Sequence, residues 1–290
     1  MFTAKIQNAQ GAILTLTNNE SQYQLFDITG IDQPSAQINF TNIATLDGAI
    51  FNSAKLDTRN IVLYIRINGN VEANRHILYQ MFKTKESCIF YYKNDTVDVM
   101  IQGYVESVEC PIFTDSEIMQ ISILCPNPYF KSVDDTVIEI IKRDALFSFP
   151  FSINEGEPIA LSNYNVDQTA TLINNSTNDL GMIIQIDVDK DMEEDEIVIS
   201  PQITNVDTSE FFKLITTLIS GDRVVINTNK GNKSVRRIRN GVSTNIFSNI
   251  GSGSTFLTIP IGESKFTYSA QDGSQYMNVK FIYTEEYRGV

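Results

Sequence analysis

The chain has 290 residues, enough for two ordinary domains that each bury a core of their own. Hydrophobic residues make up 42% of the sequence and aromatic residues 10%, which excludes an intrinsically disordered chain. The formal net charge of −13 argues against a surface built to bind nucleic acid or an anionic membrane.

Neither a signal peptide nor a membrane-spanning helix is predicted. The first 17 residues lack the continuous apolar segment of a secretory signal, and no window of 18 apolar residues occurs anywhere. We therefore expect a protein that is made and folded in a cytosol. Its three cysteines, Cys88, Cys110 and Cys125, are an odd set without close spacing, so we expect reduced, buried thiols and no disulfide framework.

The first 130 residues are predicted to form a β-rich domain with one helix. Segments with alternating apolar and polar residues indicate strands at 12–17, 23–28, 36–40, 60–68, 88–92, 97–105 and 118–124. Asn18-Asn19 is interpreted as the turn of a hairpin that joins the first two of these strands. Asp47-Gly48 marks another turn.

Residues 71–82 change the hydrophobic period from that of a strand to that of a helix. The apolar residues that recur there are Ile77, Leu78, Met81 and Phe82. Asn70 is a suitable N-cap, and Glu72 lies in the first turn, where a negative charge is favourable. This segment is the one helix that the sequence predicts.

Residues 121–130, ISILCPNPYF, form a strand that runs into a stiff elbow. Two prolines, two positions apart, prevent a helix or a central strand from continuing. We interpret the elbow as the exit from the first domain; it consists of Cys125, Pro126, Pro128, Tyr129 and Phe130. The predicted domains are residues 1–131, a connector at 132–144 and a second domain at 145–290.

The second domain is predicted to be an antiparallel β-sandwich. Short strands are expected at 170–173, 182–188, 197–204, 223–227, 256–259, 264–269 and 275–283. Loops rich in Asn, Ser, Gly and Asp separate them every 8–15 residues or so, a spacing typical of sandwiches. No repeat of fixed period is present in the sequence.

Catalytic, metal and cofactor motifs are not found in the sequence. The single histidine, His76, lies inside the predicted helix, and the scattered cysteines have no zinc-ligand spacing. There is no glycine-rich phosphate loop and no G-x-S-x-G motif. The residues thus predict a non-enzymatic protein without a cofactor.

Two charged segments are candidate binding sites. Residues 187–196 begin like a calcium loop, but the sixth position is Met192 rather than glycine and the twelfth is Val198 rather than glutamate. A solvated acidic loop is therefore the better interpretation. The basic residues 230–239 are spread along a hairpin, which favours a solvated hairpin, with a charged subunit interface as the alternative.

Several segments in order resemble the distal tail proteins of tailed phages that infect Gram-positive bacteria. These are the elbow LCPNPYF at 124–130, RNIVL at 59–63 with the helical RHILY at 75–79, SGDRVVINT at 220–228 with GNKSV at 231–235, IGESKFTY at 261–268 and YRGV at 287–290. The similarity spans about residues 59 to 290.

The resemblance implies a mainly β fold: an N-terminal β-barrel-like domain with one helix, followed by a C-terminal galectin-like antiparallel β-sandwich. It implies a structural, non-catalytic hub of a phage or prophage tail tip, made in the bacterial host cytoplasm and forming a hexameric ring. The implied partners are further copies of the chain, the tail tube protein and a tail-associated lysin or tail-tip protein, with receptor-binding proteins as additional candidates. The predicted helix, with Arg75, His76 and Tyr79, is the expected ring interface.

Two other functions remain open at this point. The second domain would be a carbohydrate-binding module if a tyrosine such as Tyr268 or Tyr276 stacked against a sugar of the host cell wall. The chain has no tryptophan, and its histidine lies in the other domain, so the usual sugar-binding residues are missing. A tail-associated hydrolase is the third alternative, although no pair of carboxylates stands out.

Overall fold

A computed structural model describes residues 2–19, 21–45, 47–111, 117–140, 143–145, 162–164, 169–190 and 195–290. The chain divides into two compact units: unit 1 comprises Met1–Val133 and Glu286–Val290, and unit 2 comprises Asp134–Glu285. The chain therefore leaves unit 1 after Val133 and returns to it at Glu286. This division differs from the predicted domains, which put residues 132–144 in a connector and 286–290 in the second domain.

Unit 1 is built on one antiparallel sheet with the strand order β2-β1-β7-β8-β9-β6-β3, and β10 pairs with both β8 and β25. Its strands are β1 (Thr3–Asn8), β2 (Ile13–Leu16), β3 (Tyr23–Thr29), β6 (Arg59–Ile67), β7 (Ser87–Lys93), β8 (Asp98–Glu109), β9 (Ile118–Cys125), β10 (Phe130–Ser132) and β25 (Glu286–Tyr287). The alternation of β6 produces the core: Ile61, Leu63, Ile65 and Ile67 all point inward and are buried.

This sheet is not the expected barrel. Among the described residues, its edge strands β2 and β3 meet at one isolated parallel bridge, between Thr17 and Gln24, and do not form a ladder. The predicted hairpin between residues 12–17 and 23–28 is also wrong, because β2 pairs with β1 and β3 pairs with β6. The turn lies earlier than predicted: the Asn8 Oδ1 accepts the Ala12 N–H at 2.8 Å, and Gly11 has a φ of 86°.

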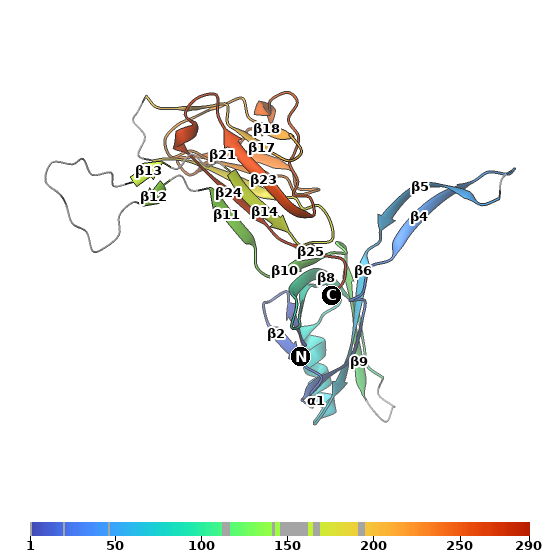
Figure 1. Cartoon of the computed structure of the whole chain (residues 1–290). Coiled ribbons are helices and arrows are strands. Elements are labelled where there is room, and N and C mark those ends of the chain that lie inside the picture. Colours follow the sequence, from blue (N-terminus) through green and yellow to red (C-terminus); the bar gives the residue numbers. More distant parts are fainter. Residues whose placement is uncertain are drawn as a thin grey trace. The chain divides into compact units, whose positions relative to one another are not determined.

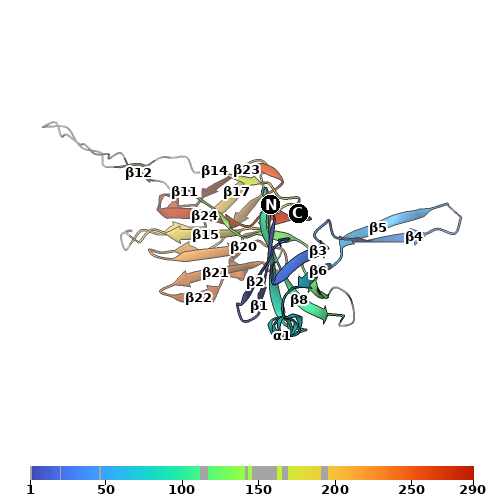
Figure 2. The ribbon, with the colours of Figure 1, turned by 90° about the horizontal axis from the view of Figure 1, so that it is seen from below.

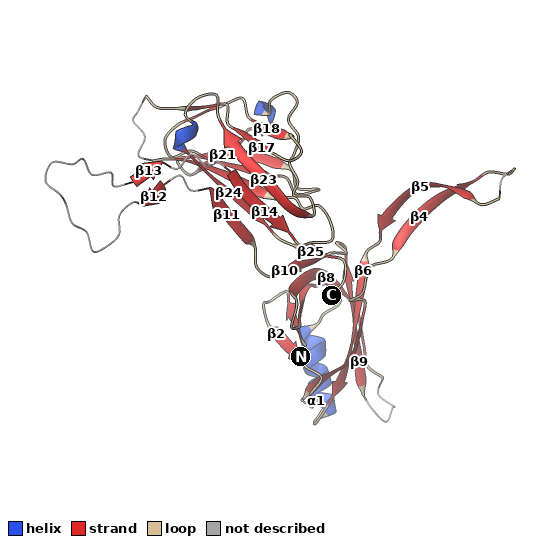
Figure 3. Cartoon of the chain, in the orientation of Figure 1, coloured by secondary structure: helices blue, strands red, loops and turns tan. Residues whose placement is uncertain are grey.

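The helix α1 (Val71–Met81) is present as predicted and lies along the sheet of unit 1 (Figure 3). The Asn70 Oδ1 caps it by accepting the Ala73 N–H at 3.3 Å. Leu78 and Phe82 are buried in the sheet core, whereas Ile77 is 49% exposed. The buried face is completed by the polar Asn74, whereas Ile77, one of the apolar residues that predicted the helix, faces outward.

Two further strands of unit 1, β4 (Ala36–Asn42) and β5 (Ala49–Leu56), form a separate antiparallel hairpin. Both Figure 1 and Figure 2 show this hairpin extending away from the main sheet of the unit. We call these two strands the arm.

Unit 2 contains two larger antiparallel sheets, with strand orders β11-β24-β15-β20-β21-β22 and β14-β23-β17-β18. The strands are β11 (Thr136–Ile140), β14 (Thr169–Asn174), β15 (Ile183–Val188), β17 (Gln202–Asn205), β18 (Phe211–Lys213), β20 (Arg223–Asn227), β21 (Ser234–Arg239), β22 (Val242–Asn245), β23 (Gly262–Ser269) and β24 (Met277–Tyr283). Smaller elements are the pairs β12 (Arg143–Ala145) with β13 (Ser162–Tyr164) and β16 (Val198–Ile199) with β19 (Thr217–Leu218), and the 3-10 turns η1 (Phe247–Asn249) and η2 (Ser274–Tyr276).

The two larger sheets of unit 2 share one core and therefore pack face to face. Phe266 on β23 and Phe281 on β24 are both buried, and their ring centroids lie 5.6 Å apart. Two predicted strands differ in detail. Residues 197–204 divide into β16 and β17 at Ser200, whose φ is 50°, and residues 256–259 contribute only the bridge from Ile259 to Leu180. No helix in the described part of the chain is long and apolar enough to span a membrane.

Candidate subunit interface

The arm has one apolar and one polar face. Residues directly opposite each other in an antiparallel pair point to the same side. The register pairs Ala36 with Leu56, Ile38 with Ala54 and Phe40 with Phe51, so these six residues share one face. The strands therefore form an amphipathic ribbon.

The apolar face of the arm is uncovered. Ile38, Phe40 and Phe51 are 50%, 58% and 59% exposed, although such side chains are normally buried. An isolated two-stranded hairpin is only marginally stable in water, and clustered exposed apolar side chains mark interaction surfaces. The arm thus has the properties of a segment that packs against another molecule.

The opposite face of the arm is mostly polar and satisfies its own hydrogen bonds. The Asn39 Nδ2 donates to the Ser53 Oγ at 3.1 Å, and the Asn52 Nδ2 donates to the Thr41 Oγ1 at 2.7 Å. Ile50, which pairs with Thr41, is the one large apolar residue on this face and is 53% exposed. Water can solvate this face, so the two faces are not equivalent.

The arm joins the sheet through two short segments, residues 30–35 and 57–58, which we call the arm root. The Asp57 N–H donates to the Ser35 O at 2.9 Å and so holds the two segments together. Gly30 has a φ of 84°, and a Cβ there would lie 1.9 Å from the Asn60 O. Only glycine fits this close approach between the arm root and β6.

Arg59, the first residue of β6, is buried at the arm root. Its Nη1 donates to the Gly30 O and to the Asp32 O, each at 2.5 Å. Its Nε donates to the Pro128 O at 2.8 Å, and its Nη2 donates to the Arg288 O. The guanidinium thus holds together three parts of the chain that are far apart in sequence.

The predicted elbow lies within unit 1, between β9 and β10, and therefore precedes the point at which the chain leaves this unit. Cys125 and Phe130, at its two ends, are buried in the sheet core, and the Phe130 ring lies 4.6 Å from the Arg59 guanidinium carbon. The Tyr129 N–H donates to the Asn127 Oδ1 at 3.1 Å. Pro126 is exposed, and Pro128 contributes its carbonyl to Arg59.

The three helix residues expected at a ring interface differ in exposure. His76 and Tyr79 are exposed next to Ile77, and the rings of His76 and Tyr79 lie 6.5 Å apart edge to face. The Arg75 side chain is only 14% exposed and donates to the Glu72 Oε2 at 2.6 Å. His76 and Tyr79 are therefore accessible to a partner, whereas Arg75 is largely covered.

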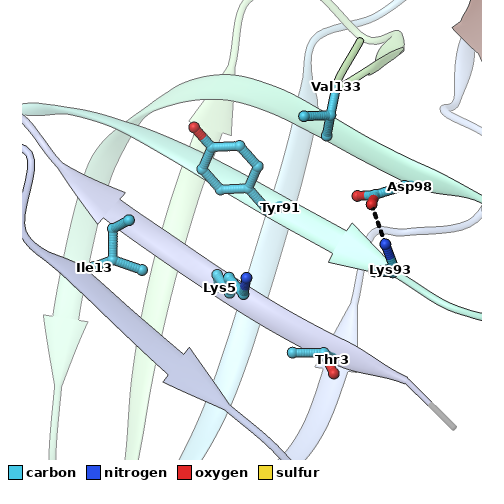
Figure 4. A pocket seen from close by; sticks show the side chains of 7 residues that line it. All are labelled: Thr3, Lys5, Ile13, Tyr91, Lys93, Asp98 and Val133. Atoms are coloured by element: carbon cyan, nitrogen blue, oxygen red, sulfur yellow. Dashed lines mark hydrogen bonds and ion pairs between the residues drawn. The ribbon is translucent and has the colours of Figure 1, made fainter.

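Figure 4 shows a pocket of about 410 Å³ in unit 1, formed by β1, β2, β7 and β8; its lining residues are Thr3, Lys5, Ile13, Tyr91, Lys93, Asp98 and Val133. The Asp98 carboxylate is already paired with the Lys93 ammonium at 2.5 Å. The Tyr91 hydroxyl donates to the Gln7 Oε1 at 2.9 Å. Among the described residues of the lining, no nucleophile has an adjacent base, so these side chains form no constellation for covalent catalysis.

In unit 2, an ion pair joins the buried carboxylate of Asp222 to the partly exposed guanidinium of Arg239, the last residue of β21. The Arg239 Nε donates to the Asp222 Oδ1 at 2.7 Å, and its Nη2 donates to the Oδ2 at 2.5 Å. Burial alone would raise the pKa of Asp222, but the Arg239 fork and the Ile219 N–H outweigh it and lower that pKa. Arg239, one residue of the basic segment 230–239, therefore has a structural role.

The two tyrosines considered for sugar stacking are differently placed. Tyr268 is buried in the sandwich core, its hydroxyl donates to the Met277 O at 3.3 Å, and burial raises its pKa to about 12. Tyr268 therefore cannot stack on a sugar. The hydroxyl of Tyr276, which is half-buried, donates to the Glu196 carboxylate.

The remaining candidate metal ligands do not form a cluster among the described residues. Among the described residues, no group of three or more His, Cys, Asp or Glu side chains is placed to hold a metal ion. Part of the acidic segment, residues 191–194, lies outside the described residues. All three cysteines are free; Cys88 and Cys125 are buried, and burial raises their pKa values to about 12 and about 11. Cys110 is half-buried, contrary to the prediction.

Neither the arm nor the role of Arg59 is predicted from the sequence. The signal for the arm was present as alternation at 36–40 and 49–56, with Ile38 and Phe40 followed by Ile50 and Phe51 around the Asp47-Gly48 turn. No local signal marks Arg59, because its acceptors lie up to 229 positions away in the chain.

Residues 175–287 match the family model described as the C-terminal domain of the siphovirus-type tail component. A search of the curated proteins found no match. Among solved structures, the chain is similar to the SPP1 Dit protein (gp 19.1), described as a paradigm of the hub adsorption apparatus in phages that infect Gram-positive bacteria. The TM-score is 0.67 with 9% sequence identity, and the match covers 98% of each chain.

Two structures of the phage P2 baseplate in its activated conformation, one with Ca and one with Sr, also contain a similar chain. The TM-scores are 0.50 and 0.51 and the identities 10% and 11%, with both chains covered completely. At these identities the likeness shows a shared fold. The whole chain, and not only its second unit, therefore has a Dit-like fold.

Proposed function

We propose that this chain is the hexameric hub that joins the tail tube to the tail-tip proteins. Through its residues 175–287 the chain belongs to the siphovirus-type tail component family. As a phage tail component it is part of the virion tail. The observation that carries the proposal is the full-length likeness to the SPP1 Dit hub protein. Unit 1 forms the ring in this proposal, and unit 2 is a galectin-like sandwich.

The arm supports a contact between copies of the chain. Its apolar face is not covered by its own unit, since Ile38, Phe40 and Phe51 are exposed. Burying three such side chains stabilises a contact by several kcal/mol in total, at about 1.5–3 kcal/mol for each complete burial. A contact that uses an arm on one copy and a different surface on the next is heterologous, and heterologous contacts that close form rings.

The exposed face of α1 is the second proposed ring surface. Ile77, His76 and Tyr79 present an apolar and aromatic patch there. Arg75 is mostly covered, so its proposed role is to orient Glu72 rather than to meet a neighbour directly. The tail tube protein and a tail-associated lysin or tail-tip protein are the proposed partners above and below the ring, with receptor-binding proteins on the outside, and no catalytic step is assigned to the chain.

Mass photometry and light scattering of the purified chain test the ring. We expect a species of six times 32.6 kDa, about 196 kDa. Phe40→Ser combined with Phe51→Ser should yield the 32.6 kDa monomer, because both residues lie on the apolar face of the arm.

Ile50→Ser is the matched control, since Ile50 is adjacent to Phe51 and similarly exposed but lies on the opposite face. It should still form the ring. Electron microscopy of assembled tails covers the case in which assembly needs a tail partner. A tail without a six-copy ring of this chain would exclude the proposal.

A further inference from the structure

The segment that returns from unit 2 packs on the arm root. Gly289 lies so close to it that an added Cβ would be 3.1 Å from both the Asp32 C and the Gln33 N. The Val290 N–H donates to the Ile31 O at 3.2 Å. The segment Glu286–Val290, which we call the return segment, is therefore in direct contact with the residues that lead into the arm.

The return segment is also paired with the strand that leads out of unit 1. β25 pairs with β10 through Phe130–Tyr287 and Lys131–Glu286, a ladder of only two pairs. The Lys131 ammonium and the Glu286 carboxylate lie 3.6 Å apart. The outgoing and returning chain segments thus lie side by side within unit 1, and their ladder is too short to be rigid by itself.

Arg59 connects this ladder to the arm root. Its four donor contacts go to two carbonyls of the arm root, to the Pro128 O just before β10 and to the Arg288 O in the return segment. Among the described residues, no carboxylate forms an ion pair with Arg59, and carbonyl oxygens accept all four hydrogen bonds of its buried guanidinium. A buried charge is tolerated only while its hydrogen bonds are made, so loss of any of the three segments makes the remaining arrangement less favourable.

We propose that Arg59 is the positioning residue that fixes the arm root and the return segment relative to each other, so that the two segments move together. The direction of the arm is then coupled to the place where the chain leaves and re-enters unit 1. Arginine suits this role because its planar fork carries five N–H groups, whereas a lysine ammonium cannot reach carbonyls on several sides at once. The coupling is intramolecular and does not depend on a ring.

Hydrogen exchange of the full chain, measured by mass spectrometry in the Phe40→Ser/Phe51→Ser background, tests the coupling without assembly. Two amides report on it: Asp57, which donates to Ser35 in the arm root, and Val290, which donates to Ile31 from the return segment. Arg59→Lys should accelerate exchange of the peptides that contain both amides by about tenfold or more. Arg66→Lys, on the same strand and with the Phe26 ring 4.9 Å from its guanidinium carbon, is the matched control and should change the exchange of neither peptide by more than about twofold.

Gly289→Val provides a second variant that leaves Arg59 intact. Its side chain must displace the backbone of the arm root, so exchange at Asp57 should rise together with exchange at Val290. An effect confined to the return segment would overturn the coupling. Loss of protection across the β7–β8 ladder in Arg59→Lys would also overturn it, because Arg59 would then support the whole core and not a local connection. Neither result bears on the ring, which the oligomeric mass tests separately.

Discussion

The arm of unit 1 and the sandwich of unit 2 are both made of antiparallel strands with alternating side chains, but they use the alternation in opposite ways. In the sandwich, the apolar faces of two sheets bury each other, as Leu172 and Phe281 show. In the arm, an equally clear apolar face, with Phe40 and Phe51, remains exposed. Alternation specifies which side chains share a face, and the surroundings decide whether that face is core or interface.

The two units also differ in how they bind an arginine side chain. Arg239 in unit 2 pairs with Asp222, 17 positions away, and its pKa is raised by hydrogen bonding to that carboxylate. Arg59 in unit 1 is bound by carbonyls from three distant segments, and burial lowers its pKa, with the charges of Cys125 and Asp32 opposing that effect. The first arrangement stabilises one corner of the sandwich, whereas the second brings separate segments together.

The largest expected effect is a loss in the free energy of unfolding, and it distinguishes a core residue from a surface residue within β14. Leu172→Ala should lower the free energy of unfolding of unit 2 by about 2–5 kcal/mol, because it leaves a cavity between the sheets. The neighbouring Ile173 is half-exposed, so Ile173→Ala should change the free energy of unfolding by no more than about 0.5 kcal/mol. Denaturant unfolding of both variants measures the difference, and equal losses would contradict the assigned alternation of β14.

A smaller effect is expected from the ion pair of the sandwich. Asp222→Asn keeps the shape of the side chain but removes the charge that faces Arg239, and it should destabilise unit 2 by about 1–3 kcal/mol. Arg223→Gln is a suitable control, since the Arg223–Asp187 pair lies on the half-exposed outer face. Thermal unfolding should separate the two variants; identical melting temperatures would show that burial of the pair does not matter.

The same carboxylate predicts an acid limit for unit 2. The pKa of Asp222 is lower in the folded protein than its ordinary value, so its contribution to stability is complete above the unfolded pKa of about 3.9. The contribution is lost as the pH falls through the lower, folded value. Unfolding of wild type and Asp222→Asn, compared from pH 6 down to about pH 2, should converge at the acid end. A constant difference across that range would refute the assignment.

The smallest expected effect concerns the arm, and it is informative because it is small. Phe51→Ser removes a large aromatic side chain, yet it should change the stability of the dissociated chain by no more than about 0.5 kcal/mol, since that side chain is already in water. Chemical denaturation at low protein concentration measures this value. A loss comparable to that of Leu172→Ala would mean that the arm packs on its own subunit.

Much of the fold follows from local sequence. The alternation in residues 60–67 predicted β6 and its buried face, and Asn70 with the change of period predicted α1. The candidate interface was less predictable. His76 and Tyr79, two of the three helix residues expected at a ring interface, are exposed, whereas Arg75 is covered. Ile77 faces outward, since the 3.6-residue period places Asn74, Leu78 and Phe82 on the buried side.

The sequence by itself determined the mainly β class, the single described helix and the faces of the strands, because each depends on the preferences of residues close together in the chain. The tertiary structure decided what those elements pack against. The sheet of unit 1 is open where a barrel was expected, the arm is uncovered, and the return segment packs against the arm root. These outcomes depend on contacts between residues such as Arg59 and Arg288, whose separation in sequence leaves no local pattern to recognise.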